Sequence, residues 1–247
     1  MLSILSKLAP SVARRLEDVQ AMRNLPQMTI CLMLDKTEGN DPFYRTVVER
    51  FHRNAVSVHP RYKVIPGFKY GVACCDLAAE PRGYQWIIES SARRNYKKAA
   101  RTGYTFRRID FNAHLADIGR IRRSTDVRQG KVPTSFFEEV SRISDPPSRS
   151  SFHDYPYFGV FFGDQLRAYG SCLVSGELMS VEHILGHADH VEDGIVPMLL
   201  IEIAEYARQN YPSVRYYCYG SFFGASPTMR RFKTKFGFSP HKVTWTL

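Results

Sequence analysis

The sequence predicts an α/β protein of the α+β type, and three features of its second half indicate that class. Apolar runs of strand length are joined by tight turns at Gly163-Asp164 and Gly176-Glu177, which is a hairpin signal. A long segment from Ile195 to Gln209 then has its apolar residues at helical spacing. The chain closes with a strand, a short helix and another strand. A sheet with helices packed on it is the structure we expect.

Length and composition set the number of domains. The chain has 247 residues, of which 44% are hydrophobic and 23% charged, so it can bury a core and is not a disordered tail. We expect residues 1–83 to form a small α+β part of unknown role. Residues 84–247 are expected to form the main domain.

Each element follows from local periodicity and turn residues. In the N-terminal part we expect a helix over 2–24, a strand over Met28–Leu34, a helix over Tyr44–Val58 and strand material within Arg61–Leu77. The main domain is expected to contain helix Tyr84–Arg101, strand Tyr104–Phe111, helices Leu115–Arg123 and Thr134–Ile143, strands Tyr157–Phe162, Leu166–Ser175 and Leu178–Leu185, a loop over 186–194, helix Ile195–Gln209, strand Val214–Tyr219, helix Thr228–Phe236 and strand Lys242–Leu247. Ser135 and Glu138 resemble a capping pair at the start of helix Thr134–Ile143.

Charge is concentrated in one window. The formal net charge is +10 and the pI about 9.4, which favours an anionic partner. Residues 91–131 hold twelve Lys and Arg against three Asp, whereas residues 151–247 are almost balanced. The basic 91–131 segment therefore makes nucleic acid, tRNA or DNA, a candidate partner through phosphate contacts.

Cysteine usage and hydropathy bear on the compartment. The five cysteines are odd in number and none lies in a CxxC motif, so we expect free thiols and a cytoplasmic protein. No run of about 18 apolar residues occurs, so we expect no transmembrane segment.

The order of elements from residue 104, with "VRYYCYG", "SPTMRRFKTK" and "FGFSP" near the end, resembles the GNAT superfamily of acyl-CoA N-acyltransferases. The resemblance covers residues 84–247 and implies a mixed, mostly antiparallel central sheet flanked by helices. It also implies that the fourth and fifth strands of this domain diverge to admit a thioester. The stretch "RRNYKKAARTGYTFRRIDFNAHLADIGRI" resembles the FemABX-like branch, which implies an aminoacyl-tRNA donor.

The GNAT resemblance implies acetyl-CoA or another acyl-CoA as donor. Backbone N–H groups at the start of the helix near Ile195 would hold its pyrophosphate, as a helix N-terminus does for anions generally. Gly194 would let the phosphate approach closely. The residues implied at this cofactor site are Leu185, Gly186, His187, Gly194, Ile195, Arg230 and Arg231, with Lys233 and Lys235 near the phosphates.

Two features keep other interpretations open at this cofactor site. Arg230, Arg231, Lys233 and Lys235 could instead form a solvated helix face. The loop departs from the family form Q/R-x-x-G-x-G/A and contains Asp189, Glu192 and Asp193, so a different acyl donor stays open.

Direct attack of an amine on the acyl carbonyl needs a base and a proton donor. Glu182 is the candidate base or amine-binding carboxylate, with His183 as the alternative. Because side chains alternate along a strand, we expect only one of the two to face the cleft. Tyr219 or Ser221 could protonate the leaving thiolate. A structural role stays open for Glu182, His183 and Tyr219.

The acceptor and metal predictions rest on weaker patterns. Ser124, Arg128 and Gln129 are candidates for binding the acceptor, because Arg recognises carboxylate or phosphate through two parallel bonds. A polar loop between helices is the alternative. His183, His187 and His190 have helical spacing, but the strand and loop expected there, interrupted by Gly186, break a zinc-binding face, so no metal is predicted.

The sequence contains no GxSxG, P-loop or GxGxxG motif and so gives no support to those enzyme classes. Three functions remain. The first is N-acyltransfer, most simply of acetyl, from acyl-CoA to a small or macromolecular amine. The others are aminoacyl transfer from tRNA, and nucleic-acid binding or modification by a GNAT-like domain. The acceptor, the acyl length and the oligomeric state stay open.

Overall fold

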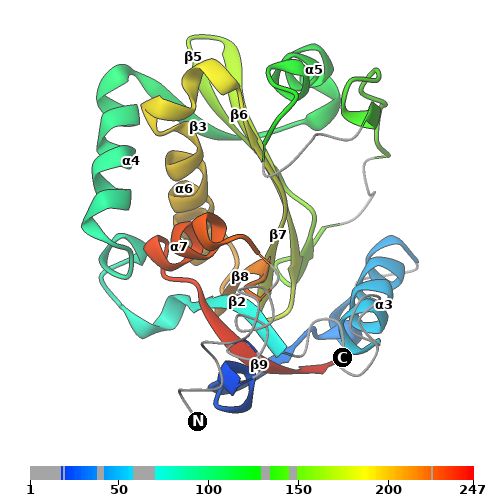
Figure 1. The fold of residues 1–247 in the computed structure, drawn as a ribbon. Helices are drawn as coiled ribbons and strands as arrows, with labels where there is room; N and C mark the ends of the chain where they lie inside the picture. The colour runs from blue at the N-terminus through cyan, green and yellow to red at the C-terminus, as the bar shows by residue number, and fades with distance from the viewer. Residues whose placement is uncertain are drawn as a thin grey trace.

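The computed structural model describes residues 18, 20–37, 42–57, 70–128, 134–144, 149–223 and 225–247. Its centre is one sheet with the strand order β1-β9-β2-β8-β7-β6-β5-β3, and a short β4 pairs with β6 (Figure 1). The strands are β1 Gln27–Cys31, β2 Tyr70–Asp76, β3 Tyr104–Ile109, β4 His153–Asp154, β5 Tyr157–Phe162, β6 Gln165–Ser175, β7 Leu178–Gly186, β8 Tyr216–Ser221 and β9 Ser239–Thr246.

The strand directions confirm the predicted class of sheet. Among the strands that the structure describes, β1 with β9 and β7 with β8 are the parallel pairs. Every other pair in this sheet is antiparallel. The sheet is therefore mixed and mostly antiparallel, with the β5–β6–β7 meander that the turns at Gly163 and Gly176 predicted.

Helices cover both faces of the sheet. They are α3 Pro42–Val56, α4 Ser90–Thr102, α5 Leu115–Arg123, α6 Ile195–Asn210 and α7 Pro227–Lys235, with short 3-10 turns η1 Leu34–Lys36, η2 Leu77–Ala79, η3 Tyr84–Trp86, η4 Phe111–His114, η5 Thr134–Phe136 and η6 Ala188–Asp193. In Figure 1, α4, α6 and α7 lie on one side of the sheet, and α3 and α5 on the other.

Alternation along the strands divides the core between these two sides. Ala73 and Cys75 of β2 belong to the large cluster around α6, whereas Val72 and Cys74 belong to the cluster beneath α3. A third cluster, beneath α5, includes Phe111 and Tyr169. Successive residues of a strand point to opposite faces, so each strand supplies both cores.

The N-terminal strands belong to the same sheet as the rest. β1 lies beside β9, and β2 lies between β8 and β9. Strands from both sides of residue 83 thus share one hydrogen-bonded sheet, while the boundary at that residue stays a prediction. The strand predicted over Met28–Leu34 and the helix over Tyr44–Val58 are confirmed, and most of the helix predicted over 2–24 lies outside the described residues.

Two local predictions were wrong. Of the predicted helix Thr134–Ile143, with its capping pair Ser135 and Glu138, only the turn η5 forms. Among the described residues 134–144 only Val140 is buried, so this stretch has no apolar face to pack, and the Ile143 N–H instead donates to the Asn112 side chain. The loop predicted at 186–194 is shorter than expected, because Gly186 is the last residue of β7 and Ala188–Asp193 form the 3-10 turn η6.

Candidate active site

Strands β7 and β8 separate after a short stretch of parallel pairing. They pair only over Leu178–Ser180 and Tyr216–Cys218. Beyond that point β7 continues beside β6, and Ser221 at the end of β8 pairs with Val72 of β2. We call the separated parts, Val181–Gly186 and Tyr219–Ser221, the β7–β8 fork. Along these parts of the described chain, the two strands do not pair with each other.

A β-bulge places two candidate residues of the fork at the surface. The register changes between Ser171 and Cys172, which pair with His183 and Val181, so Glu182 is the extra residue. Glu182 and His183 are both exposed. The alternation expected for these two residues does not hold, because a bulge breaks it, and which of them faces the cleft stays a prediction.

On β8, Tyr219 and Ser221 stand at the opposite side of the fork. Tyr219 is half-buried, and burial raises the pKa of its hydroxyl to about 12, so it carries its proton at neutral pH. Ser221 is exposed, and its hydroxyl donates to the Phe223 carbonyl at 2.6 Å. The fork thus brings all four predicted catalytic residues to the two strands that flank it.

Lys233 is a fifth polar group at the fork. It comes from α7, where Pro227 at the first turn and the Ser226 hydroxyl, which accepts from the Met229 N–H, start the helix. Its side chain is buried, with 5% of its surface exposed, and its ammonium donates to the carbonyls of Tyr219 and Ser221, both at 2.6 Å. Burial lowers its pKa to about 8.

The interpretation of Lys233 as part of a solvated helix face was wrong, because its side chain is buried. The position of its ammonium near a coenzyme phosphate stays a prediction. Its position beneath β8 fixes the backbone on that side of the fork. The pattern of the helix offers a signal that was missed, since Phe232 and Phe236 flank the lysine and both pack on the core. An ammonium has three donors, and two backbone bonds leave one for a ligand oxygen.

The predicted pyrophosphate loop is already occupied by protein groups. A Cβ on Gly194 would lie 2.3 Å from the Asn95 carbonyl oxygen, so the space on which phosphate approach depended is filled by α4. Lys98 donates to the Glu192 carbonyl at 2.8 Å, and Tyr104 donates to Asp193 at 2.8 Å. These contacts fix the loop against α4 and β3.

The other residues predicted at this loop point elsewhere. The Ile195 side chain is fully buried, and Leu185 packs on the cluster beneath α5. A Cβ on Gly186 would meet Val196 at 2.8 Å. His187 is half-buried, and burial lowers its pKa. The N–H groups of His187, Ala188, His190 and Gly194 already donate to oxygen atoms of the protein, so these four amides are not available to a donor phosphate.

Both arginines predicted to contact the coenzyme have carboxylate partners. Arg230 forms a bidentate pair with Asp18 at 2.6 and 2.8 Å. Arg231 forms another with Glu89, and more than half of the Arg231 side chain is exposed. An exposed pair of this kind contributes little to stability and exchanges readily with a ligand, whereas the Arg230 pair is better shielded.

Two of the three predicted acceptor residues support the loop. The Arg128 guanidinium donates to the carbonyls of Gly186 at 3.1 Å and Ile121 at 2.7 Å. The Ser124 hydroxyl accepts from the Ala188 N–H at 2.9 Å. Arg128 and Ser124 thus join α5 to the end of β7. Gln129 lies outside the described residues.

Three further observations concern the described part of the chain. No group of three or more His, Cys, Asp or Glu side chains there lies close enough together to hold a metal ion. None of its helices has the length and apolar character needed to cross a membrane. All five cysteines are free thiols.

Comparison with known proteins places the fold. No protein-family model and no curated protein matches this chain. The crystal structure of FemX aligns with 69% of this chain and 59% of its own length, with 9% sequence identity and a TM-score of 0.52. The fold is therefore that of FemX.

Two other solved structures align less well. The C-terminal domain of a putative lysylphosphatidylglycerol synthetase from Agrobacterium fabrum covers 69% of this chain and 58% of its own, at 15% identity and a TM-score of 0.48. A tandem GNAT protein from the clavulanic acid biosynthesis pathway covers 96% and 69%, at 13% identity and 0.44. The chain spans just under three fifths of FemX and of the synthetase domain. FemX and the strand order together confirm the predicted fold class, a mixed, mostly antiparallel sheet flanked by helices, with the fold of FemX.

Proposed function

We propose that this chain is an acyltransferase that moves an acyl group to an amine at the β7–β8 fork. The observation that carries this proposal is the fork itself. In a FemX-like fold, it gathers one carboxylate, one imidazole and three proton-bearing groups around the point where the two strands separate. Such a set can bind an acyl carbonyl, activate an amine and protonate a leaving group.

The reaction assigns a role to each of these groups. Glu182, or His183 in its place, accepts a proton from the amine as its nitrogen attacks the carbonyl carbon. A C–N bond forms, and the C–S bond of a thioester or the C–O bond of a ribose ester breaks. The leaving thiolate or alkoxide takes a proton from Tyr219, Ser221 or Lys233. Lys233, with its pKa of about 8, is the best matched of these to neutral pH.

Acyl-CoA, most simply acetyl-CoA, is the first candidate donor, as the GNAT resemblance implies. The second is aminoacyl-tRNA, and one observation favours it. The position expected to hold the coenzyme pyrophosphate is filled by Asn95 of α4, and Asp189, Glu192 and Asp193 surround it. An aminoacyl ester needs no pyrophosphate there. Five free thiols support a reducing compartment, the cytoplasm, for either reaction.

The basic 91–131 segment would supply the tRNA surface. In the structure it is divided, because α4 lies on the α6 side of the sheet and α5 on the other side (Figure 1). Arg94, Lys97 and Arg101 of α4 are exposed. We therefore assign the RNA-binding role to α4, on the same side of the sheet as α7.

The deciding experiment titrates the purified protein separately with acetyl-CoA, longer acyl-CoAs and aminoacyl-tRNA at two salt concentrations. Desulfo-CoA and uncharged tRNA are the controls for plain phosphate binding. Saturable binding that depends on the acyl arm identifies the donor. A salt slope reduced by Arg94→Gln with Lys97→Gln supports tRNA on α4. Failure of every acyl donor to bind and to acylate an amine would refute the proposed function.

A further inference from the structure

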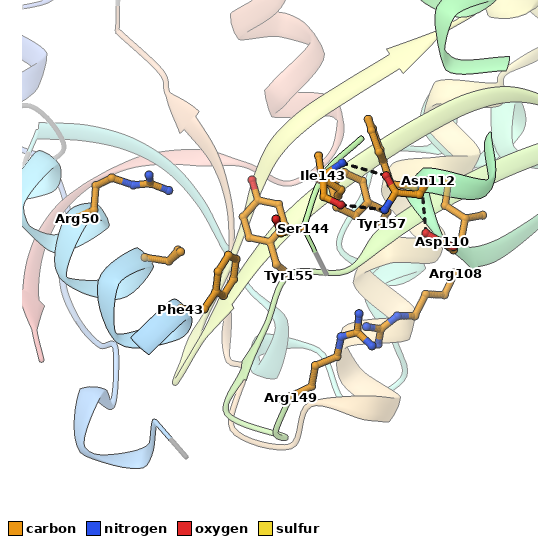
Figure 2. Close-up of a pocket in the computed structure, with 13 residues that line it drawn as sticks. Phe43, Arg50, Arg108, Asp110, Asn112, Ile143, Ser144, Arg149, Tyr155 and Tyr157 are labelled. Carbon is orange, nitrogen blue, oxygen red and sulfur yellow. Dashed lines mark hydrogen bonds between the residues drawn. The ribbon is translucent and has the colours of Figure 1, made fainter. Parts of the chain in front are cut away.

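A pocket of about 730 Å³ lies on the face of the sheet opposite α6. Figure 2 shows it between α3 and the segment that follows β3. Phe43 and Arg50 come from α3, whereas Arg108 and Asn112 come from β3 and η4. Its volume is within the range of small-molecule sites. None of the residues considered so far for catalysis or donor binding lines it.

Arginine side chains make one wall of this pocket positively charged. In Figure 2 the guanidinium groups of Arg108 and Arg149 lie beside one another. Both contact Asp154, Arg108 at 2.8 Å and Arg149 at 3.5 Å. Asp154 is buried, with 2% of its surface exposed, while about a third of the Arg108 side chain and more than two fifths of the Arg149 side chain are exposed.

This arrangement offers more donors than its carboxylate can accept. Asp154 also accepts from the Tyr211 hydroxyl at 2.6 Å and the Tyr155 N–H at 2.7 Å. Two guanidinium groups carry ten N–H donors between them, whereas a carboxylate has about four acceptor positions, and one further Arg108 N–H donates to the Tyr211 hydroxyl at 3.4 Å. The buried aspartate holds the two arginines side by side, and both side chains are partly exposed on the pocket lining.

The formal charge of the pocket is positive. Three arginines, Arg50, Arg108 and Arg149, line it, against Asp110 on the lining and Asp154 behind it. The Asp110 carboxylate is engaged by the Asn112 N–H at 2.9 Å. Aromatic rings of Phe43, Tyr155 and Tyr157 form much of the remaining wall. A ligand with one anionic group and an apolar body fits this lining.

Paired residues of β5, β6 and β7 connect the pocket lining to the fork. Tyr157 of β5 pairs with Ser171 of β6, which pairs with His183 of β7. Directly paired residues point to the same face of a sheet, and neighbouring strands lie about 4.8 Å apart, so roughly 10 Å separates Tyr157 from His183. Tyr155, on the pocket lining, also interacts electrostatically with Glu182. Burial raises the pKa of the Tyr155 hydroxyl, and the Glu182 carboxylate raises it further.

We propose that this pocket binds the anionic end of the acceptor, an amine that carries a carboxylate or a phosphate group. Arg149 and Arg108 hold that group, Arg50 adds a third positive charge, and the amine of the same molecule extends to Glu182 and His183. The anion-binding part stands on the pocket alone, and the identification with the acceptor rests on the proposed function.

The test uses pairs of amines that differ only in the anionic group, O-phosphoethanolamine with ethanolamine and L-phenylalanine with L-phenylalaninamide. Calorimetric titration is done on the whole chain and on Arg149→Gln and Arg50→Gln. The control is Arg45→Gln, which removes the same charge from α3 outside the pocket, where Arg45 pairs with Glu49 at 3.8 Å. Arg108 is left intact, since its loss would strand the buried Asp154 charge.

We expect the anionic member of at least one pair to bind about tenfold more tightly than its neutral partner, as charge-assisted hydrogen bonds allow. Arg149→Gln and Arg50→Gln should remove that preference and Arg45→Gln should keep it. The amine pair that shows the preference identifies the preferred anionic group as carboxylate or phosphate.

Absence of any preference, or a preference unchanged in both pocket variants, overturns the proposal. Failure of the proposed function alone would give a different result. The wild-type pocket would still prefer the anionic amine, and the two pocket variants would lose that preference, but no acyl donor would be consumed.

Discussion

Burial of the Lys233 ammonium beneath β8 makes the fork sensitive to pH. In the unfolded chain this lysine has its ordinary pKa of 10.5, and in the folded chain a pKa of about 8. Between these values the unfolded state binds more protons than the folded state, so stability rises with pH through this window. Below pH 8 the folded protein bears the cost of a buried charge.

We therefore predict that wild-type stability, relative to Lys233→Met, increases by roughly 2 to 3 kcal/mol between pH 7 and pH 10. Urea unfolding of both proteins across that range measures the difference. Lys97→Met, at an exposed position on α4, is the control and should keep a constant difference from wild type. A flat difference for Lys233→Met would show that its amine titrates normally.

Glu182 is the second residue with a specific expectation. Glu182→Gln keeps the shape of the side chain and removes its basicity, so we expect turnover to fall about 10²-fold while donor binding is unchanged. Steady-state kinetics with the donor identified by titration gives kcat and KM separately. Asp164→Asn, in the exposed β5–β6 turn, is the matched loss of a carboxylate.

Equal turnover in Glu182→Gln and wild type would remove this residue as the base. The same pair of measurements on His183→Gln would then decide the alternative. A rise in KM alone would indicate that Glu182 binds the amine without accepting its proton.

At the scale of the elements, the start of α6 packs directly against α4. Gly194 has a φ of +86° and its Cα faces the Asn95 carbonyl, so both the backbone angle and the space require glycine. Gly163, in the β5–β6 turn, has a φ of +55° but no atom within 4 Å of an added Cβ. Both positions therefore need a left-handed backbone angle, but only at Gly194 would an added Cβ collide with a neighbouring atom.

Comparison of Gly194→Ala with Gly163→Ala separates these effects. We expect Gly163→Ala to cost about 1 kcal/mol from the left-handed backbone alone, and Gly194→Ala to cost roughly 3 kcal/mol because α4 must also move. Thermal or urea unfolding of both variants gives the two values. Equal losses would mean that α4 does not press on this glycine.

Over the whole molecule, the sheet joins the two ends of the chain. β2 makes the only described link between β8 and β9, because it pairs with both. Without it, β9 would lose its antiparallel neighbour, and the clusters that contain Val72 and Ala73 would be exposed. Residues 84–247 therefore depend on the segment before them.

We expect a fragment of residues 84–247 to lack a cooperative unfolding transition, whereas the full chain shows one. Circular dichroism during urea titration, with amide exchange of β8, distinguishes the two. A fragment that unfolds cooperatively, with protected β8 amides, would instead establish residue 83 as a true domain boundary.

Elements with local signals could be predicted from the amino-acid sequence. The glycine turns predicted the β5–β6–β7 meander, and apolar spacing predicted α5, α6 and α7 to within a few residues. These signals act over a few neighbouring residues, so they survive without knowledge of the fold. The helix predicted over residues 134–143 does not form, because helical spacing of apolar residues stabilises a helix only where its apolar side packs on a core.

The surroundings of the candidate site depend on the packing of distant segments. It placed β2 between β8 and β9, made Glu182 the bulge residue, buried Lys233 and gave Arg230 a partner 212 positions away in Asp18. It also brought Arg50, Arg108 and Arg149 to one pocket. Burial and ion pairing depend on which distant residues the packed chain brings together, and no local pattern of charge or hydrophobicity records that.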